Sequence, residues 1–187
     1  RAADVVLGGQ VMLAACGATR CTIAIEDDKP EAATAIAAAI AAARDERVEL
    51  VELPAIYPLG AERQLIEVVT GREVPHDVLP PAIGVVCQNV GTAAEIHRAV
   101  ERGEPLIARI TTVTGAALDE PRNFEVLLGT PLSVLLKAAG FHPERATRIV
   151  MGGPMMGFAL PHAELPVVKT TNCVLAPTEA ELPTPPP

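Results

Sequence analysis

Aromatic residues are scarce in this chain, which has no Trp, one Tyr and three Phe among 187 residues. The core must therefore be built from Val, Leu, Ile and Ala, and bases have few aromatic rings on which to stack, which excludes most RNA-binding modules. Basic residues are also few, with 15 Lys and Arg against 23 Asp and Glu. Because phosphate binding depends on clustered cations, a net charge of −8 predicts no nucleic acid among the partners.

Long apolar runs are missing as well. Hydrophobic residues make up 49% of the chain and the mean hydropathy is +0.31, but much of this is alanine. No run approaches the roughly 18–20 apolar residues of a membrane span, so we expect a soluble protein. The chain starts at Arg1 without a Met and without the features of a secretory signal, so we expect a piece excised from a longer protein.

Metal-binding spacings are also absent. The cysteines form no CxxC pair, and we interpret them as reduced thiols of a cytosolic protein. They are Cys16, Cys21, Cys87 and Cys173. The histidines are scattered in or beside expected surface loops and helices, with no ligand at metal spacing. They are His76, His97, His142 and His162. We therefore expect neither a metal site nor a catalytic residue among them.

The first part of the chain alternates between short β-branched runs and longer helical patterns. Strands are expected at 21–25, 48–53 and 83–87, and helices at 4–15, 30–44, 61–70 and 92–102. Such alternation predicts an α/β fold with a mostly parallel sheet covered by helices, here over residues 1–104.

After Pro105 the pattern changes to strand, strand, helix, strand. Strands are expected at 106–114, 123–128 and 148–151, with a helix that has Thr130 as N-cap, Pro131 at its first position and Gly140 after its end. This order is typical of a β-grasp domain, assigned to residues 105–162. Residues 163–187 are expected to hold a closing strand and, from Pro177 onward, an extended proline-rich linker.

Two turns that open helices behind strands are candidate ligand sites, because open α/β sheets bind ligands there. In the first, Tyr57-Pro58-Leu59-Gly60-Ala61-Glu62, Gly60 would let a planar ligand approach the backbone and Glu62 would accept hydrogen bonds. In the second, Gln88-Asn89-Val90-Gly91-Thr92, free N–H groups favour an anion or a flavin edge. On the residues alone, an ordinary tight turn and an ordinary helix cap are the favoured interpretations.

A third segment, Gly152-Gly153-Pro154-Met155-Met156-Gly157, is distinctive but offers little chemistry. Methionines more often pack than bind, so we favour packing of the β-grasp domain against its neighbour. A contact with a substrate or another subunit is the alternative.

Together these three segments closely resemble the C subunits of Rnf (Rsx) electron-transport complexes, relatives of the NADH-binding flavoprotein subunit of complex I. The resemblance extends from about residue 8 to about 178. In that flavoprotein a Tyr-x-x-Gly-Glu-Glu turn lies around flavin mononucleotide (FMN) and NADH, which implies these roles for Tyr57, Gly60 and Glu62, although Ala61 replaces the first acid. An Asn-Asn-Val-Glu-Thr stretch borders the flavin, and its counterparts are Gln88, Asn89 and Thr92.

The resemblance implies a parent subunit on the cytoplasmic side of the bacterial inner membrane, bound to the other Rnf subunits. It would oxidise NADH through FMN and pass electrons through two [4Fe–4S] clusters toward a ferredoxin-type partner, or in reverse. The family's glycine-rich loop would lie before Arg1 and its cluster cysteines after the proline tail, so this chain alone is expected to be inactive. The alternatives are a non-enzymatic docking or ligand-binding module and a fragment of a related flavin-dependent cobalamin reductase.

Overall fold

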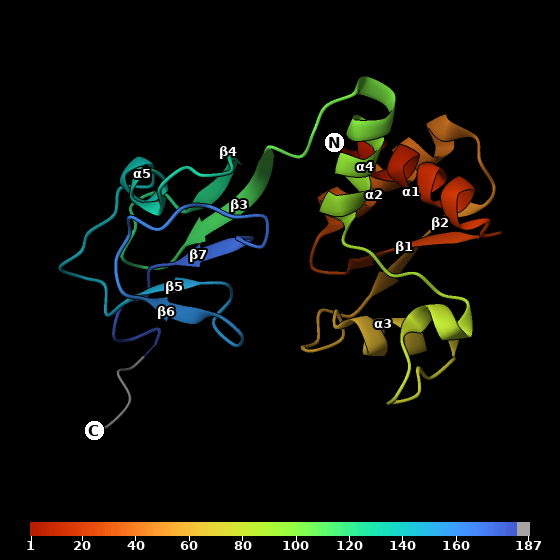
Figure 1. The fold of residues 1–187 in the computed structure, drawn as a ribbon. Helices are drawn as coiled ribbons and strands as arrows, with labels where there is room; N and C mark the ends of the chain where they lie inside the picture. The colour runs from red at the N-terminus through yellow and green to blue at the C-terminus, as the bar shows by residue number, and fades with distance from the viewer. Residues whose placement is uncertain (183–187) are drawn as a thin grey trace. The chain divides into compact units, whose positions relative to one another are not determined.

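The computed structural model describes residues 1–182 and divides the chain into two compact units (Figure 1). The first is Arg1–Pro105 and the second begins at Leu106. Each has its own hydrophobic core, so each is described by itself.

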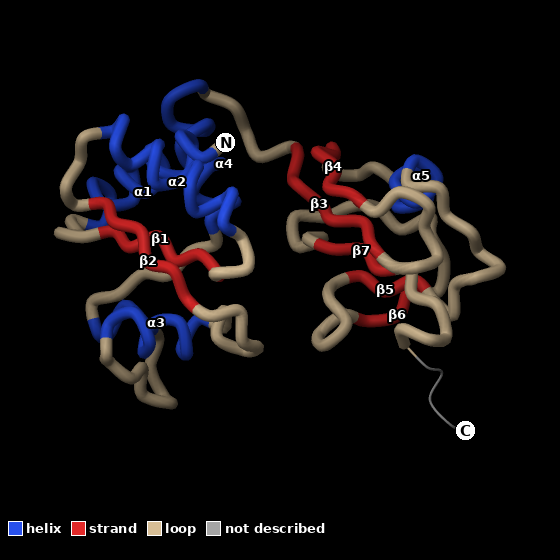
Figure 2. Tube along the Cα trace, turned by 180° about the vertical axis from the view of Figure 1, so that it is seen from behind, coloured by secondary structure: helices blue, strands red, loops and turns tan. Residues whose placement is uncertain are grey.

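The first unit is a layered α/β structure. Its elements are α1 (Ala2–Cys16), β1 (Cys21–Glu26), α2 (Pro30–Ala43), β2 (Val48–Leu53), α3 (Glu62–Thr70), the 3-10 helix η1 (Pro80–Ile83) and α4 (Val90–Arg102). Strands β1 and β2 are parallel, with Cys21 opposite Val48 and Glu26 opposite Leu53. Helices α1, α2 and α4 lie on one side of this sheet and α3 on the other (Figures 1 and 2). The expected α/β class with a parallel sheet is confirmed.

The glycine Gly8 allows helices α1 and α4 to approach each other closely. A Cβ on Gly8 of α1 would lie 1.8 Å from the carbonyl oxygen of Ala93 in α4, so any side chain there would collide with backbone. Beside this crossing, Val6 and Leu13 of α1 pack with Ile23 of β1 in the core. A glycine that weakens the helical pattern of the sequence is thus required by tertiary packing.

The surface position expected for His97 is wrong. Its side chain is buried in α4, and its Nδ1 lies 2.9 Å from Asp4 Oδ1 in the first turn of α1. Arg102 donates a second hydrogen bond to the same oxygen at 2.9 Å. A partner distant in sequence allows this histidine to be buried, which spacing along the chain does not reveal.

The strand expected at 83–87 is also wrong. Pro80–Ile83 forms η1, and the residues that follow run to α4 without pairing with any strand in the described part of the chain. Val85 and Val86 have β propensity, but a strand also needs a neighbour to receive its hydrogen bonds.

The second unit is a five-stranded mixed sheet with one helix. Its elements are β3 (Ala108–Thr114), β4 (Arg122–Leu127), α5 (Leu132–Ala138), β5 (Ile149–Met151), β6 (Phe158–Leu160) and β7 (Cys173–Leu175), in the sheet order β4-β3-β7-β5-β6. The parallel pair β3 and β7 lies inside, and the other pairs are antiparallel. This is the expected β-grasp-like arrangement. Pro131 rather than Thr130 is the N-cap of α5, so the helix starts one residue later than expected.

The segment after β7 is not an extended linker where the structure describes it. Pro177 is fully buried, and its carbonyl oxygen accepts a hydrogen bond from Thr147 N at 3.0 Å. Residues 178–182 form a turn in which Glu181 Oε2 accepts from Ala116 N at 2.8 Å and from Thr178 N at 3.1 Å. The rest of the expected linker, 183–187, lies outside the described residues. Within 1–182, no helix combines the length and the apolar character needed to cross a membrane.

Candidate functional site

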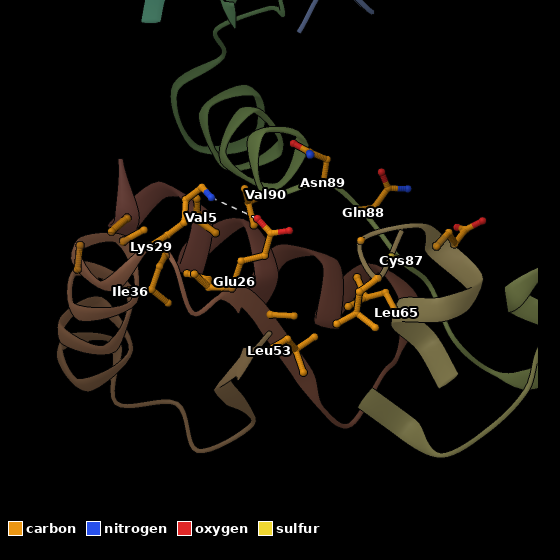
Figure 3. A pocket seen from close by; sticks show the side chains of 18 of the residues that line it. Val5, Glu26, Lys29, Ile36, Leu53, Leu65, Cys87, Gln88, Asn89 and Val90 are labelled. Atoms are coloured by element: carbon orange, nitrogen blue, oxygen red, sulfur yellow. Dashed lines mark hydrogen bonds and ion pairs between the residues drawn. The ribbon is translucent and has the colours of Figure 1, made fainter. Parts of the chain in front are cut away.

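A cavity of about 720 Å³ lies at the carboxyl ends of β1 and β2 in the first unit (Figure 3). Ala24, Ile25 and Glu26 line it from β1, and Leu53 lines it from β2. The amino-terminal turns of α1, α2, α3 and α4 supply further wall residues. Parallel strands direct their following loops to one edge of the sheet, and that edge is where open α/β folds bind ligands.

Four of the six residues predicted to contact cofactor line this cavity. Gly60 and Glu62 come from the turn before α3 and its first residue, and Gln88 and Asn89 come from the segment before α4. Tyr57 is 64% exposed and is not part of the wall. Thr92 is exposed in the first turn of α4 and is also outside the wall.

The turn before α3 leaves space and hydrogen-bonding capacity at the cavity. Among the described residues, no atom lies within 4 Å of where a Cβ on Gly60 would stand, so packing does not require the glycine. The N-cap of α3, Ala61, offers no side-chain cap, so the first N–H groups of the helix remain open to a ligand. Glu62 lies at the positive end of this helix, which stabilises its charge.

Asn89 caps α4 and still has donors available. Its Oδ1 accepts a hydrogen bond from Gly91 N at 2.8 Å, which is an N-cap contact. The cap uses the oxygen of the carboxamide, so the NH₂ group can donate to a ligand in the cavity.

The sequence prediction missed the charged residues contributed by the N-cap of α1 and by the turn after β1. Arg1 and Lys29 bring positive charge to the wall, and the Lys29 ammonium donates to Asp28 at 2.7 Å and to Glu26 at 3.3 Å. Hydrogen bonds to Asp28 and then to Glu26 raise the pKa of Lys29, so it stays charged. The position of Glu26 to Lys29 directly after a strand was the signal that could have found them, since this turn lies at the same sheet edge.

Cys87 lies directly before the second predicted turn and is influenced by Glu62 of the first. It lines the cavity half-buried, and burial raises the pKa of its thiol, with a further contribution from the negative charge of Glu62. An uncharged thiol here is a packing group rather than a nucleophile.

The lining suits a flat, mainly apolar ring with polar edges. Much of the wall is aliphatic, with polar groups supplied by Glu62, Gln88 and Asn89. Gln88 and Asn89 lie next to each other at the start of α4 (Figure 3). A volume of about 720 Å³ is within the range of cofactor pockets. The residues present therefore fit the ring system of FMN. For its phosphate, the cations that the described wall offers are Lys29 and Arg1.

Arg63 fixes the loop that follows α3. Its guanidinium donates to four carbonyl oxygens, those of Val74 (2.9 Å), Pro75 (2.7 Å), His76 (3.2 Å) and Val78 (2.9 Å). This fork of donors holds residues 74–78 against the helix that begins at the cavity.

In the second unit, the Gly-Gly-Pro-Met-Met-Gly segment is the turn between β5 and β6. Met155 is 70% and Met156 83% exposed, so neither side chain is buried within the second unit. A Cβ on Gly157 would lie 2.5 Å from Gly153 O, which explains the glycine. Cys173 is half-buried in β7, and burial raises the pKa of its thiol. All four cysteines are free, and no three His, Cys, Asp or Glu side chains within 1–182 are placed to hold a metal.

Comparisons with known proteins agree with this architecture. The family model of the Nuo51 FMN-binding domain matches residues 1–98, and that of the SLBB domain matches 110–159. The C subunit of the ion-translocating oxidoreductase complex of Pseudomonas aeruginosa is 50% identical over the whole chain, and its counterpart from Yersinia enterocolitica is 45% identical over 97% of it. The chain spans only 24% and 26% of the length of these relatives.

Solved structures share the fold at low sequence identity. An NAD+-reducing [NiFe]-hydrogenase matches in its H2-reduced state with a TM-score of 0.74 and 20% identity, covering 93% of this chain and 36% of that one. Its air-oxidized state matches with a TM-score of 0.72 at 19% identity, covering 93% and 35%. The chain therefore belongs to the Nuo51 FMN-binding domain family, and the resemblance to the Rnf C subunits indicated by its turns is confirmed.

Proposed function

We propose that the cavity at the end of β1 and β2 is part of the flavin and NADH site of a subunit that oxidises NADH and passes electrons onward through iron–sulfur clusters. The observation that carries the proposal is the convergence of Gly60, Glu62, Gln88 and Asn89 on one cavity in a chain of the FMN-binding family. Bound flavin would supply the chemistry, accepting a hydride and releasing single electrons. The parent subunit would lie at the cytoplasmic face of the inner membrane with the other subunits of the complex and a ferredoxin-type partner.

The residues of this chain would bind and orient the cofactor. The Asn89 NH₂ and the open N–H groups of α3 would donate to ring oxygens, and Glu62 would accept from ring or ribose donors. The aliphatic wall, with Leu53 and Leu65, would exclude water from the ring. Tyr57 and Thr92 lie outside the wall, and we propose them as contacts only for the part of the ligand that extends from the cavity.

Titration of FMN into the full-length subunit, followed by quenching of flavin fluorescence, tests this proposal. Glu62→Ala combined with Asn89→Ala should weaken binding at least about tenfold, the loss expected for two polar contacts. Glu67→Ala, on the same helix but outside the wall, is the matched control. Unchanged affinity in the double variant, with the fold intact, would contradict the proposal. The 187-residue chain alone should show no NADH oxidation.

A docking role for the second unit is the other candidate, favoured by the exposure of Met155 and Met156. Removing residues 106–157 from the full-length subunit separates the two roles. Lost complex assembly with retained NADH–ferricyanide activity would favour docking, whereas lost flavin would favour a direct role in the cofactor site.

A further inference from the structure

The hairpin formed by β5 and β6 in the second unit is uncharged and carries exposed apolar side chains. From Ile149 to Pro161 no residue is charged, although charged residues make up 20% of the whole chain. Phe158 is 60% exposed, and Met155 and Met156 are exposed further still. Large apolar side chains gathered on one exposed hairpin are typical of an interaction surface, whereas single ones are ordinary.

Glycines give the turn of this hairpin a narrow, fixed shape. Gly157 N donates to Gly153 O at 2.7 Å, which closes the turn. Gly152 has a φ of +102°, and a Cβ on it would lie 2.9 Å from Gly157 Cα, so another residue there would force the turn open. The two methionines between these glycines are therefore presented by a preorganised turn. Preorganisation lowers the entropy lost when a partner binds.

Strand β6 is also the outermost strand of its sheet (Figures 1 and 2). Directly after β5, Gly152 N donates to Cys173 O at 2.8 Å and so faces β7. Since hydrogen-bonding directions alternate along a strand, Met151 faces β6, and Phe158 opposite it faces β5. The next residue, Ala159, then directs its N–H and C=O away from β5. Within the described residues no strand pairs with that edge.

The opposite edge strand, β4, is protected by charge. It carries Arg122 and Glu125, and the Arg122 guanidinium is held by Glu120 at 2.9 Å and by Ala138 O at 2.7 Å. Charged side chains on an edge strand hinder its pairing with another chain. Strand β6, Phe158–Leu160, has no such side chain. Of the two edges of one sheet, the β6 edge is therefore the one suited to pairing.

We propose that the β5–β6 hairpin is a surface through which the parent subunit binds another subunit of its complex. An extended segment of the partner would pair with Ala159, and apolar side chains of that segment would cover Met155, Met156 and Phe158. Because β6 is only three residues long, the side chains would provide most of the contact and the backbone would fix its register. The inference rests on the proposed membership of a complex with several subunits, and it does not depend on which cofactor binds.

Charge and hydrogen bonding favour a different polypeptide over other occupants. A lipid surface attracts proteins through cations, which the hairpin lacks, and hydrocarbon offers no partner for the Ala159 backbone. A second copy would bring together two chains with a net charge of −8 each. The end of this chain has Pro183 and the prolines at 185–187, which have no N–H for a strand ladder. The relatives that the chain matches are named as subunits of a complex, which would provide such a polypeptide.

Photo-crosslinking within the assembled complex tests the proposal. Met156→p-benzoylphenylalanine in the full-length subunit should form a covalent adduct with one other subunit of that complex, identified by mass spectrometry. The same replacement of Val134, which is exposed on α5, is the matched control and should not give this adduct. The same adduct from both positions would overturn the proposal. So would adducts formed only with lipid, with a second copy or with another part of the same polypeptide.

Substitutions at the hairpin give an independent readout. Met156→Glu buries a charge in the contact and should weaken binding of the full-length subunit to the rest of the complex at least about tenfold, with the melting temperature and flavin content of the isolated subunit unchanged. Val134→Glu, also on an exposed apolar residue, should bind normally.

Ala159→Pro removes the outward N–H, keeps the hydrogen bonds to β5 and should also weaken assembly. Normal assembly of either folded variant would overturn the proposal, and if Ala159→Pro does not fold, Met156→Glu decides. Because FMN titration of the unaltered subunit tests the cofactor site by itself, the two proposals can fail separately.

Discussion

Asn89 and Glu62 show how a single side chain can have a structural role and still line the cavity. Asn89 caps α4 through its oxygen and keeps its NH₂ for the cavity. Glu62 begins α3, contributes to the cavity wall and raises the pKa of the neighbouring Cys87 thiol. The interpretations as a cap and as a ligand contact, which the sequence left open, are therefore compatible.

The coupling between Glu62 and Cys87 predicts a change in thiol reactivity. Burial and the Glu62 charge both raise the Cys87 pKa, so at pH 8 little thiolate is present and maleimide should label Cys87 more slowly than the exposed Cys16. Glu62→Gln removes the second cause and should speed labelling of Cys87 by less than about tenfold, since burial remains. Glu67→Gln on the same helix is the control. Identical labelling rates in the unaltered protein and the Glu62→Gln variant would show that the carboxylate does not influence this thiol.

Asp45 predicts a pH-dependent contribution to stability. It accepts hydrogen bonds from Arg47 through Nε at 2.9 Å, Nη2 at 2.8 Å and the backbone N at 3.1 Å, and Gln10 of α1 donates at 3.1 Å. These contacts, those with Arg47 first, lower its pKa well below the ordinary value of 3.8. A lowered folded-state pKa stabilises the fold above the unfolded pKa, and this contribution is lost as the pH falls below it.

Asp45→Asn should therefore lower the urea midpoint of unfolding at pH 7 and have a smaller effect at pH 3. Glu46→Gln changes the net charge equally but removes none of these hydrogen bonds, so it should behave like the unaltered chain at both pH values. An Asp45→Asn effect of the same size at pH 3 and pH 7 would contradict the linkage.

At the scale of elements, the contact between α1 and α4 depends on Gly8. In an exposed helix, replacing glycine by alanine adds stability of about 1 kcal/mol. Here the Cβ would lie 1.8 Å from Ala93 O, so Gly8→Ala should instead destabilise the first unit by about 2 kcal/mol as the helices separate. Gly60→Ala, where a Cβ meets nothing within 4 Å in the described structure, is the control for stability. Chemical denaturation of both variants is the measurement, and a more stable Gly8→Ala protein would contradict the packing argument.

The elements also show what the sequence could and could not predict. Helices with clear ends were predicted within two residues, because Pro30, Gly71 and Gly103 mark their boundaries locally. The 83–87 strand failed because a strand depends on a partner, and none of the described residues provides one. Strand β6 was missed because Phe158–Leu160 is only three residues long, too short for an alternating pattern to show.

The candidate site was also predictable only in part, because local turns can be recognised in the sequence but their placement in the fold cannot. Turns that open helices behind strands identified Gly60, Glu62, Gln88 and Asn89, all of which the structure brings to one cavity. Lys29 was missed because its role depends on which sheet edge its turn reaches. Tyr57 was placed at the site by resemblance, but in this chain its side chain is exposed and is not part of the wall.

At the scale of the whole molecule, the chain consists of two units with separate cores and separate family matches. The first is matched by the FMN-binding family and the second by the SLBB family. The two differ in how their sheets are completed within this chain. In the first, one edge of β1 lies along an open cavity, whereas in the second the central strand β7 is provided by the chain itself.

The central position of β7 predicts which shortened polypeptides of the second unit will fold. Strand β7 lies between β3 and β5 and contributes the fully buried Val174, so a polypeptide of residues 106–162 loses the centre of its sheet and should not fold. A polypeptide of residues 106–182 should unfold cooperatively and give a dispersed amide spectrum. Ending at 176 keeps β7 but removes buried Pro177 and the Glu181 contact to Ala116 N, so it should fold with lower stability. A dispersed spectrum from 106–162 would show that β7 is dispensable and that the β-grasp core is formed by the other strands alone.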